Sequence, residues 1–358
     1  MIVVVTGATG NIGSAVVDQL LAAGHSVRGL SRRPPPARHL DTKDARLRWG
    51  SADLTADDRV VRLREAFEGA DAVVHTAWGF QPTRDAAYLR QLDVGGTRAV
   101  LEAAEDAGVP HLVHFSSVGA YSPGRGPVPV EEDWPTGGTP HLPYSRDKAA
   151  AERMLDVHEE HPGHRPRVAR VRPSLVARES IGGALDRYVL PSLLPAQLIS
   201  WLPVLPLDRA FRVQLTHTDD VAQAVVTIVE RQATGPFNLA ADPVLTREDI
   251  AAALGARPVH LPWRALRLLA ASAWQARVQP VDPGWLDMAW DVPVLSSRRA
   301  REELGWTPVH DARSVLAESL RGMVRQAGSD TPALRPRRLS EQARNLLTQG
   351  PVSRRRFS

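Results

Sequence analysis

Tyr144 and Lys148 are four residues apart, a spacing that places both side chains on one face of a helix. A phenol with a pKa of about 10 is a poor acid-base catalyst at neutral pH unless a cation stabilises its phenolate, and a lysine ammonium provides that cation. Of the four tyrosines, only Tyr144 has a lysine four residues later, and Lys148 is one of only two lysines in the chain. The pattern predicts an acid-base pair, although the same spacing also occurs on solvated helix faces.

Ser117 follows the apolar run His111–Phe115, which predicts a buried strand. Ligands bind at the carboxyl ends of the strands in open α/β sheets. A hydroxyl at that place can hydrogen-bond a carbonyl or alkoxide oxygen as charge develops on it, although a serine there is also an ordinary strand-end cap. No G-x-S-x-G motif surrounds Ser117, which excludes a hydrolase built on Ser117 and His217.

Three glycines with G-x-x-G-x-x-G spacing lie between an apolar strand at residues 2–6 and a helical pattern that ends at Gly24. Such glycines permit a tight turn, close approach to a pyrophosphate and close packing of the helix on the strand. Glycines also mark ordinary turns, but the position after the first strand favours a dinucleotide loop. We expect the cofactor ligands of this loop to be Gly7, Thr9, Gly10, Asn11, Ile12 and Gly13.

The second predicted strand, residues 26–30, is followed by Ser31, Arg32 and Arg33 rather than by an acidic residue. An acid there would hold the ribose 2′-hydroxyl of NAD, whereas guanidinium and hydroxyl groups suit the 2′-phosphate of NADP. We therefore expect NADP to be the preferred cofactor, with NAD as the alternative, and these three residues to bind it. The competing interpretation is a solvated loop before the Pro34-Pro35-Pro36 run.

The elements that must position these residues alternate between strands and helices. Strand patterns occur at 72–75, 111–115 and 168–171, and helical patterns at 96–107 and 144–158. This alternation predicts an α/β fold, a Rossmann-type doubly wound parallel sheet with a smaller, mostly helical C-terminal substrate-binding region.

We divide the chain into a dinucleotide-binding domain at 1–176, with 213–240 returning to it, and a substrate-binding region at 177–212 and 241–328. Residues 181–207 are apolar but contain four prolines, which predicts short helices and loops. The amphipathic stretch 263–278 is expected to pack against the sheet domain rather than on a membrane.

Composition excludes several classes of function. The chain has no cysteine, which removes disulfides, thiolate nucleophiles and cysteine-ligated metals, and we assign no metal site. The net charge of +4 comes from residues 330–358, which contain seven arginines and two acidic residues, Asp330 and Glu341. This segment carries +5, so the rest of the chain carries −1. We expect 329–358 to be a disordered basic tail, with no nucleic-acid partner. With neither a signal-peptide pattern nor a run of 18 apolar residues, we expect a cytoplasmic protein without membrane insertion. The sequence leaves open whether the protein forms a homodimer.

These motifs together resemble the extended short-chain dehydrogenase/reductase family, also called NAD-dependent epimerase/dehydratases, from residue 1 to about 312. The resemblance implies that Tyr144 is the general acid/base, that Lys148 lowers its pKa and binds the cofactor ribose, and that Ser117 orients the reacting oxygen. It places Arg172-Pro173 near the nicotinamide and Asp53-Leu54 near the adenine. The resulting additions to the cofactor site are Asp53, Leu54, Thr76, Ala77 and Pro173.

Two further motifs, 217–222 and 304–308, also look like signatures of this family. Within the first, we expect His217 to be structural and Thr218 or Asp219 to cap the following helix. Asp53 has an alternative role in the turn before the next helix.

Three departures from the family pattern limit the reactions and substrates that we expect. Asp93 stands where many relatives carry asparagine, which puts the usual proton-relay or helix-bending role of that position in doubt. Val118-Gly119 replaces the acid pair of sugar 4,6-dehydratases, which argues against dehydration. The apolar cap favours a small or apolar carbonyl or alcohol substrate, although Arg209 and Arg212 could grip a phosphate.

The expected function is hydride transfer between NAD(P) and a small-molecule carbonyl/secondary-alcohol pair. One alternative is a nucleotide-sugar epimerase with retained NAD, which would consume no net cofactor. Another is a non-catalytic dinucleotide sensor or scaffold, against which the intact Tyr144-Lys148 pair counts.

Overall fold

The computed structural model describes residues 1–34, 44–79, 85–124, 126–161, 163, 165–183, 202–276, 282–328 and 334. Most of the apolar stretch 181–207, and the tail 329–358 apart from Leu334, therefore lie outside the described residues. The described end of that stretch corrects the prediction of short helices and loops, because Val204–Leu207 forms a strand, β8. For the residues outside the description, the predictions of short helices and of a disordered tail stay predictions.

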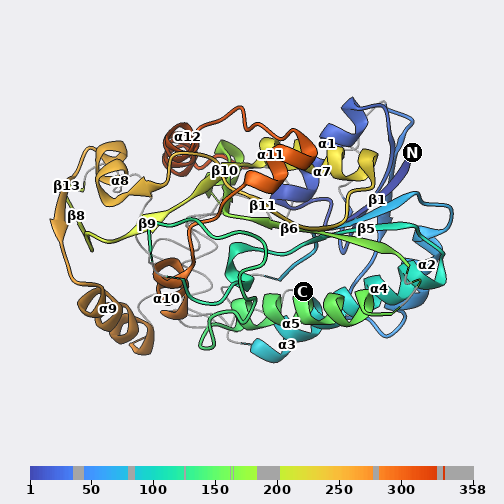
Figure 1. The fold of residues 1–358 in the computed structure, drawn as a ribbon, viewed down its shortest axis with the longest axis horizontal. Helices are drawn as coiled ribbons and strands as arrows, with labels where there is room; N and C mark the ends of the chain where they lie inside the picture. The colour runs from blue at the N-terminus through green and yellow to red at the C-terminus, as the bar shows by residue number, and fades with distance from the viewer. Residues whose placement is uncertain are drawn as a thin grey trace.

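The centre of the molecule is a seven-stranded parallel sheet with the order β11-β6-β5-β4-β1-β2-β3 (Figure 1). The order reverses between β1 and β4, so the crevice above their carboxyl ends is the expected ligand site of such a sheet. The predicted doubly wound parallel sheet is confirmed. Its strands are β1 (Ile2–Thr6), β2 (Ser26–Ser31), β3 (Leu47–Ser51), β4 (Ala72–His75), β5 (His111–Phe115), β6 (Arg167–Pro173) and β11 (Gly235–Leu239).

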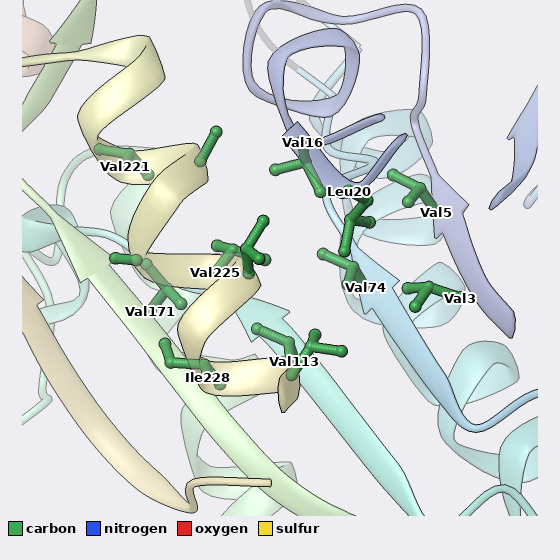
Figure 2. Close-up of a cluster of buried hydrophobic side chains, with 14 of the residues drawn as sticks. Val3, Val5, Val16, Leu20, Val74, Val113, Val171, Val221, Val225 and Ile228 are labelled. Carbon is green, nitrogen blue, oxygen red and sulfur yellow. The ribbon is translucent and has the colours of Figure 1, made fainter. Parts of the chain in front are cut away.

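Helices cover both faces of the sheet (Figure 1). One face carries α1 (Asn11–Ala22), α7 (Thr218–Arg231) and α11 (Arg298–Leu304), and the other carries α2 (Arg59–Phe67), α4 (Gly96–Asp106) and α5 (Pro143–Glu159). Because successive side chains of a strand point to opposite faces, Val3 and Val5 join the first core, whereas Val4 joins the second. Figure 2 shows Leu20 of α1 and Val225 of α7 packed over the sheet in that first core. Each such side chain stabilises the fold by about 1.5–3 kcal/mol.

Within the described residues, the C-terminal region contains three small sheets and the helices α8, α9, α10 and α12. Pairs of strands join β7 (Leu175–Ala177) to β10 (Leu215–His217), β9 (Arg212–Val213) to β12 (Leu245–Thr246), and β8 (Val204–Leu207) to β13 (Arg257–His260). The helices are α8 (Arg247–Leu254), α9 (Trp263–Gln275), α10 (Gly284–Asp291) and α12 (Ala312–Val324). Among the described residues, no helix combines the length and the hydropathy that crossing a bilayer requires.

The helix α9 corrects one expectation. Its amphipathic sequence favoured packing against the sheet domain, but none of its residues is buried, and Leu268 is 67% exposed. The helix contacts α10, where Trp263 stacks on Trp290 with 4.9 Å between ring centroids and Arg267 pairs with Asp287 at 2.7 Å, and the Trp263 backbone N–H donates to Asp208 at 2.8 Å. In Figure 1, α9 lies at the end of the molecule away from β1 and α2.

The helix predicted at 96–107 is longer than its sequence pattern indicates. It begins with α3 (Ala86–Arg90), passes through a π-helical turn η2 (Gln91–Gly95) and continues as α4. A pair of glycines at 95 and 96 suggests a boundary, but both have right-handed helical backbone angles. The π-turn leaves Asp93 buried beneath the site described next.

Candidate active site

The glycine loop lies directly on the end of β4. Gly7 has a φ of +72°, and a Cβ there would be 2.6 Å from the backbone nitrogen of Ala77. A Cβ on Gly13 would be 2.2 Å from the carbonyl oxygen of Gly7 and 2.8 Å from the Oγ1 of Thr76. Only glycine fits at either position, and the structure brings the loop together with the predicted cofactor residues Thr76 and Ala77.

The N-terminus of α1 fits an anionic group. Gly10 is its N-cap and provides no side-chain hydrogen bond, and the first turn holds no acidic residue. The first backbone N–H groups of a helix lack intrahelical acceptors and carry partial positive charge, which suits a pyrophosphate. Thr9 and Ile12 are partly exposed here, and the Oδ1 of Asn11 accepts a hydrogen bond from Thr218 at 3.2 Å.

The end of β2 holds a hydroxyl that suits a ligand. Ser31 is 7% exposed, and its Oγ has no hydrogen-bond partner within the described part of the chain. The adjacent Arg32 donates from Nη1 to the Tyr88 hydroxyl at 3.0 Å, while Arg33 is exposed. A buried hydroxyl beside two guanidinium groups fits the adenosine ribose, and its 2′-phosphate, of a dinucleotide.

Three other predicted cofactor residues are largely engaged within the protein. The Oδ1 of Asp53 accepts bonds from the backbone N–H and the hydroxyl of Thr55 at 2.8 and 2.7 Å, which is the turn role considered as its alternative. Leu54 is buried in the second core, where it contacts Gly96. Pro173 is buried at the end of β6, paired with Leu239 of β11. Contacts of these residues with a cofactor stay predictions.

The structure brings Ser117, Tyr144 and Lys148 together at the carboxyl end of β5. Ser117 follows that strand, and its Oγ accepts a bond from the Gly119 N–H at 3.0 Å. A Cβ on Gly119 would be 3.4 Å from this Oγ and 3.0 Å from the Tyr144 ring, so the two side chains flank the same glycine. Tyr144 lies in the first turn of α5, which Pro143 begins. One turn later, Lys148 is 3% exposed, and its Nζ donates to the Phe115 carbonyl at 2.7 Å.

Burial dominates the electrostatics of this group. It raises the pKa of Tyr144 to about 12, against a lowering by the hydrogen bond from Ser117. Burial also lowers the pKa of Lys148 to about 7. The Lys148 ammonium lies 3.3 Å from the centroid of the Trp78 ring and 5.9 Å from that of Tyr144. The lowering of the Tyr144 pKa by Lys148, implied by the family resemblance, therefore stays a prediction.

The space over Tyr144 is closed by apolar side chains. Its ring lies 4.9 Å from that of Trp285 and 6.3 Å, edge-on, from that of Trp78. A Cβ on Gly119 would be 2.9 Å from the Met288 sulfur and 3.0 Å from the Tyr144 ring, so the position where dehydratases carry an acid has no room for one. The sequence analysis missed Trp78, Trp285 and Met288. Only Trp78 has a local signal, because it directly follows the end of β4 and Thr76-Ala77.

A buried ion network fixes α5 to the sheet. Glu152, fully buried one turn after Lys148, accepts bonds from Arg172 at 2.8 Å and from Arg170 at 3.0 Å. Arg172 also donates to the Tyr121 hydroxyl at 2.9 Å. The side chain of Arg172, whose motif was expected near the nicotinamide, thus holds the helix that carries Tyr144 and Lys148.

His217 is structural, but the predicted cap of α7 was wrong. The N-cap is His217 itself, whose Nδ1 accepts from the Asp219 N–H at 3.2 Å, rather than Thr218 or Asp219. Its Nε2 lies 3.3 Å from Glu318 of α12. Arg209 and Arg212 are exposed, and the Nη1 of Arg212 donates to nearby backbone carbonyls, so a phosphate contact there stays a prediction.

Comparisons with known proteins agree on this architecture. The family model described as "NAD dependent epimerase/dehydratase family" matches residues 3–240. A relative from Stigmatella aurantiaca, 4-hydroxy-2-methyl-3-oxo-4-farnesyl-3,4-dihydroquinoline-1-oxide ketoreductase, is 27% identical over 351 residues, which cover 93% of this chain and 98% of the relative.

Two solved structures extend the comparison. The crystal structure of gox2253 is 26% identical with a TM-score of 0.70, over 91% of this chain and 98% of its own. A double mutant of DesIV, the dTDP-glucose 4,6-dehydratase of Streptomyces venezuelae, crystallised with NAD, is 22% identical with a TM-score of 0.65. That match covers 90% of this chain and 96% of DesIV.

Proposed function

The chain belongs to the NAD-dependent epimerase/dehydratase family of enzymes, and we propose that it is an NADP-preferring oxidoreductase that interconverts an apolar carbonyl compound and its secondary alcohol. The observation that carries the proposal is that the Ser117 hydroxyl and the Tyr144 side chain both lie against Gly119 at the carboxyl end of β5. Two hydroxyls placed there can both bond one substrate oxygen, which is what a carbonyl needs as it gains negative charge.

Each residue then has a defined task. Tyr144 donates a proton to the carbonyl oxygen during reduction and takes it back during oxidation, and Ser117 orients that oxygen. Lys148 supplies positive charge one helical turn from the phenol. A dinucleotide bound at the glycine loop supplies or accepts the hydride. The ion network around Glu152 fixes α5 to β6, the neighbour of β5 in the sheet, so that the three side chains stay together.

The choice of cofactor rests on the end of β2. NAD in the DesIV crystal supports a nicotinamide dinucleotide as the ligand of this fold. The unpartnered Ser31 hydroxyl beside Arg32 and Arg33 favours the 2′-phosphate of NADP over the free hydroxyl of NAD.

The substrate class follows from the side chains over Tyr144. Trp78, Trp285 and Met288 offer aromatic and thioether surface, which binds planar or apolar molecules better than sugars. The ketoreductase from Stigmatella, whose name describes a farnesylated dihydroquinoline, supports an apolar ketone. We place substrate binding in residues 177–212 and 241–328, from which Trp285 and Met288 come.

The test follows NADPH and NADH oxidation spectrophotometrically with a panel of aromatic and alkyl ketones and aldehydes. We expect turnover with apolar carbonyls and NADPH, and a loss of roughly 100- to 10,000-fold in kcat for Tyr144→Phe with nearly unchanged NADPH affinity. Tyr88→Phe is the matched control for kcat, because it removes a phenol outside the catalytic trio; at saturating NADPH, its kcat should equal that of the wild type. Interconversion of UDP-glucose and UDP-galactose without net oxidation of added cofactor would instead establish the epimerase alternative. Binding without any turnover would establish the sensor.

A further inference from the structure

Asp93 lies buried beside the Lys148 ammonium, although no catalytic role has been given to it so far. It is 1% exposed, and its Oδ1 accepts a hydrogen bond of 2.5 Å from the Gly79 N–H. Trp78 directly precedes Gly79, and the Nζ of Lys148 lies 3.3 Å from the centroid of the Trp78 ring. The carboxyl group and the ammonium therefore lie close to the same short segment at the end of β4.

The local backbone is built to place this carboxyl group. Asp93 is the central residue of the π-turn η2, and its own carbonyl accepts a bond from the Thr97 hydroxyl at 2.7 Å. Single π-turns within helices are often found at functional sites. A Cβ on Gly79 would be 3.0 Å from the Oδ1 of Asp93, so the glycine allows this close approach. The carboxyl group is held from both the helix and the strand end.

We propose that Asp93 is a positioning residue that acts through Lys148: its carboxylate is the counter-charge that keeps the buried Lys148 ammonium ionised. The inference deepens the proposed function, since the task of Lys148 comes from it. Asparagine at this position could accept the Gly79 hydrogen bond but could not provide the charge.

The competing carboxylates near Lys148 are already paired with arginines. Glu152 is bonded to Arg170 and Arg172, and Asp147 pairs with Arg90 at 3.0 Å. Among the described residues, Asp93 makes no arginine ion pair. It is therefore the carboxylate best able to respond to Lys148.

The other titratable groups facing this chamber do not supply the charge. His75 and His114, from β4 and β5, are fully buried, and burial lowers the pKa of each, so both are neutral at neutral pH. Tyr144 has a pKa raised to about 12 and is also neutral there. The charges that act on Lys148 are those of Asp93 and Glu152.

The direction of the coupling can be worked out. Burial disfavours the ammonium and lowers the pKa of Lys148, while Asp93 opposes the decrease. Burial disfavours the carboxylate and raises the pKa of Asp93, while Gly79 and Lys148 oppose the increase. Removing the carboxylate must therefore lower the pKa of Lys148 further.

The chain offers a direct measurement, because Lys43 and Lys148 are its only lysines. Labelling lysine with ¹³C at Cε gives two NMR signals to follow from pH 5 to 10, and Lys43→Arg assigns them. In Asp93→Asn, we expect the midpoint of Lys148 to fall below its wild-type value by roughly one to three pH units. Asp147→Asn, which removes a neighbouring carboxylate of the same helix as Lys148, is the control and should leave the midpoint nearly unchanged.

Equal Lys148 midpoints in the wild type and Asp93→Asn would overturn the inference. Asp93→Glu keeps the negative charge and should keep the Lys148 midpoint closer to the wild-type value; an equal fall in Asp93→Glu and Asp93→Asn would also overturn it. If Asp93→Asn does not fold, Asp93→Ser, which removes the charge with a smaller side chain, takes its place. None of these measurements needs a substrate, so absence of carbonyl reduction would refute the proposed function and leave this inference standing. An unchanged Lys148 titration would do the reverse.

Discussion

The helices α1 and α9 have similar lengths and both carry apolar residues, but the protein uses them in opposite ways. Half of the residues of α1 are buried, and they pack into the core beneath the glycine loop. None of the residues of α9 is buried. The proposed cofactor side is thus built from the core of the fold, whereas α9, in the proposed substrate region, contributes no buried residue.

This difference assigns separate tasks to the two regions. On the cofactor side, packing and chemistry are inseparable, because α5 supplies Tyr144 and Lys148 and is itself fixed by the buried Glu152. On the substrate side, Trp285 and Met288 reach the site from the short helix α10, only two residues of which are buried. Substrate preference should therefore change by substitution more easily than cofactor binding.

The largest expected effect compares the two helices directly. Leu20→Ala removes a fully buried side chain of α1 and should destabilise the protein by about 2–5 kcal/mol through lost burial and a cavity. The matched substitution Leu268→Ala, at a 67% exposed position of α9, should change stability by less than about 0.5 kcal/mol. Urea unfolding followed by circular dichroism measures both. If both substitutions lowered the free energy of unfolding equally, α9 would be covered in solution, and the difference between α1 and α9 would not hold.

The second effect concerns the aromatic wall. Trp285→Ala should lower kcat/KM for aromatic ketones by roughly 10- to 100-fold, because it removes the ring 4.9 Å from Tyr144, while NADPH affinity stays within about twofold. Trp134→Ala, a partly exposed tryptophan whose Nε1 bonds the Ser122 carbonyl, is the control. A parallel loss of NADPH affinity in Trp285→Ala would show that α10 supports the cofactor side as well.

The sequence predicted those parts of the molecule in which local pattern and final contacts coincide. The strand β1, the glycine loop and α1 follow one another within 22 residues, and the spacing of Tyr144 and Lys148 lies within one helix. In contrast, β3 was missed, because its residues Leu47–Ser51 show neither strict alternation nor a continuous apolar run, and none is buried. These residues form a strand because they pair with β2, and their local sequence pattern does not predict that pairing.

The same limit applies to the candidate site. The sequence placed Ser117, Tyr144 and Lys148 together, because order along the chain and position at strand ends were sufficient. It left Asp93 as an unexplained departure, since its closeness to Lys148 depends on a π-turn that the Gly95-Gly96 pair conceals. Trp285 comes close to Tyr144 only because α10 packs there in the folded protein. The hydrophobic periodicity of a single segment cannot predict such a tertiary contact.

The smallest expected effect tests whether the cofactor side distinguishes between dinucleotides. Arg32→Ala should weaken NADPH binding by roughly tenfold and leave NADH binding nearly unchanged, because the guanidinium would contact only the 2′-phosphate. Arg48→Ala removes the same charge from an exposed position on the neighbouring strand β3, and it should affect both cofactors little and equally. Fluorescence titration of each variant with both dinucleotides provides the ratio of dissociation constants. Because Arg32 bonds the Tyr88 hydroxyl, Tyr88→Phe should move the ratio in the same direction by a smaller amount if that contact orients the guanidinium. If Arg32→Ala left the ratio of the NADPH and NADH dissociation constants unchanged, Arg32 would not distinguish the two cofactors. Ser31 or Arg33 would then have to do so, or the site would bind NAD and NADP equally well.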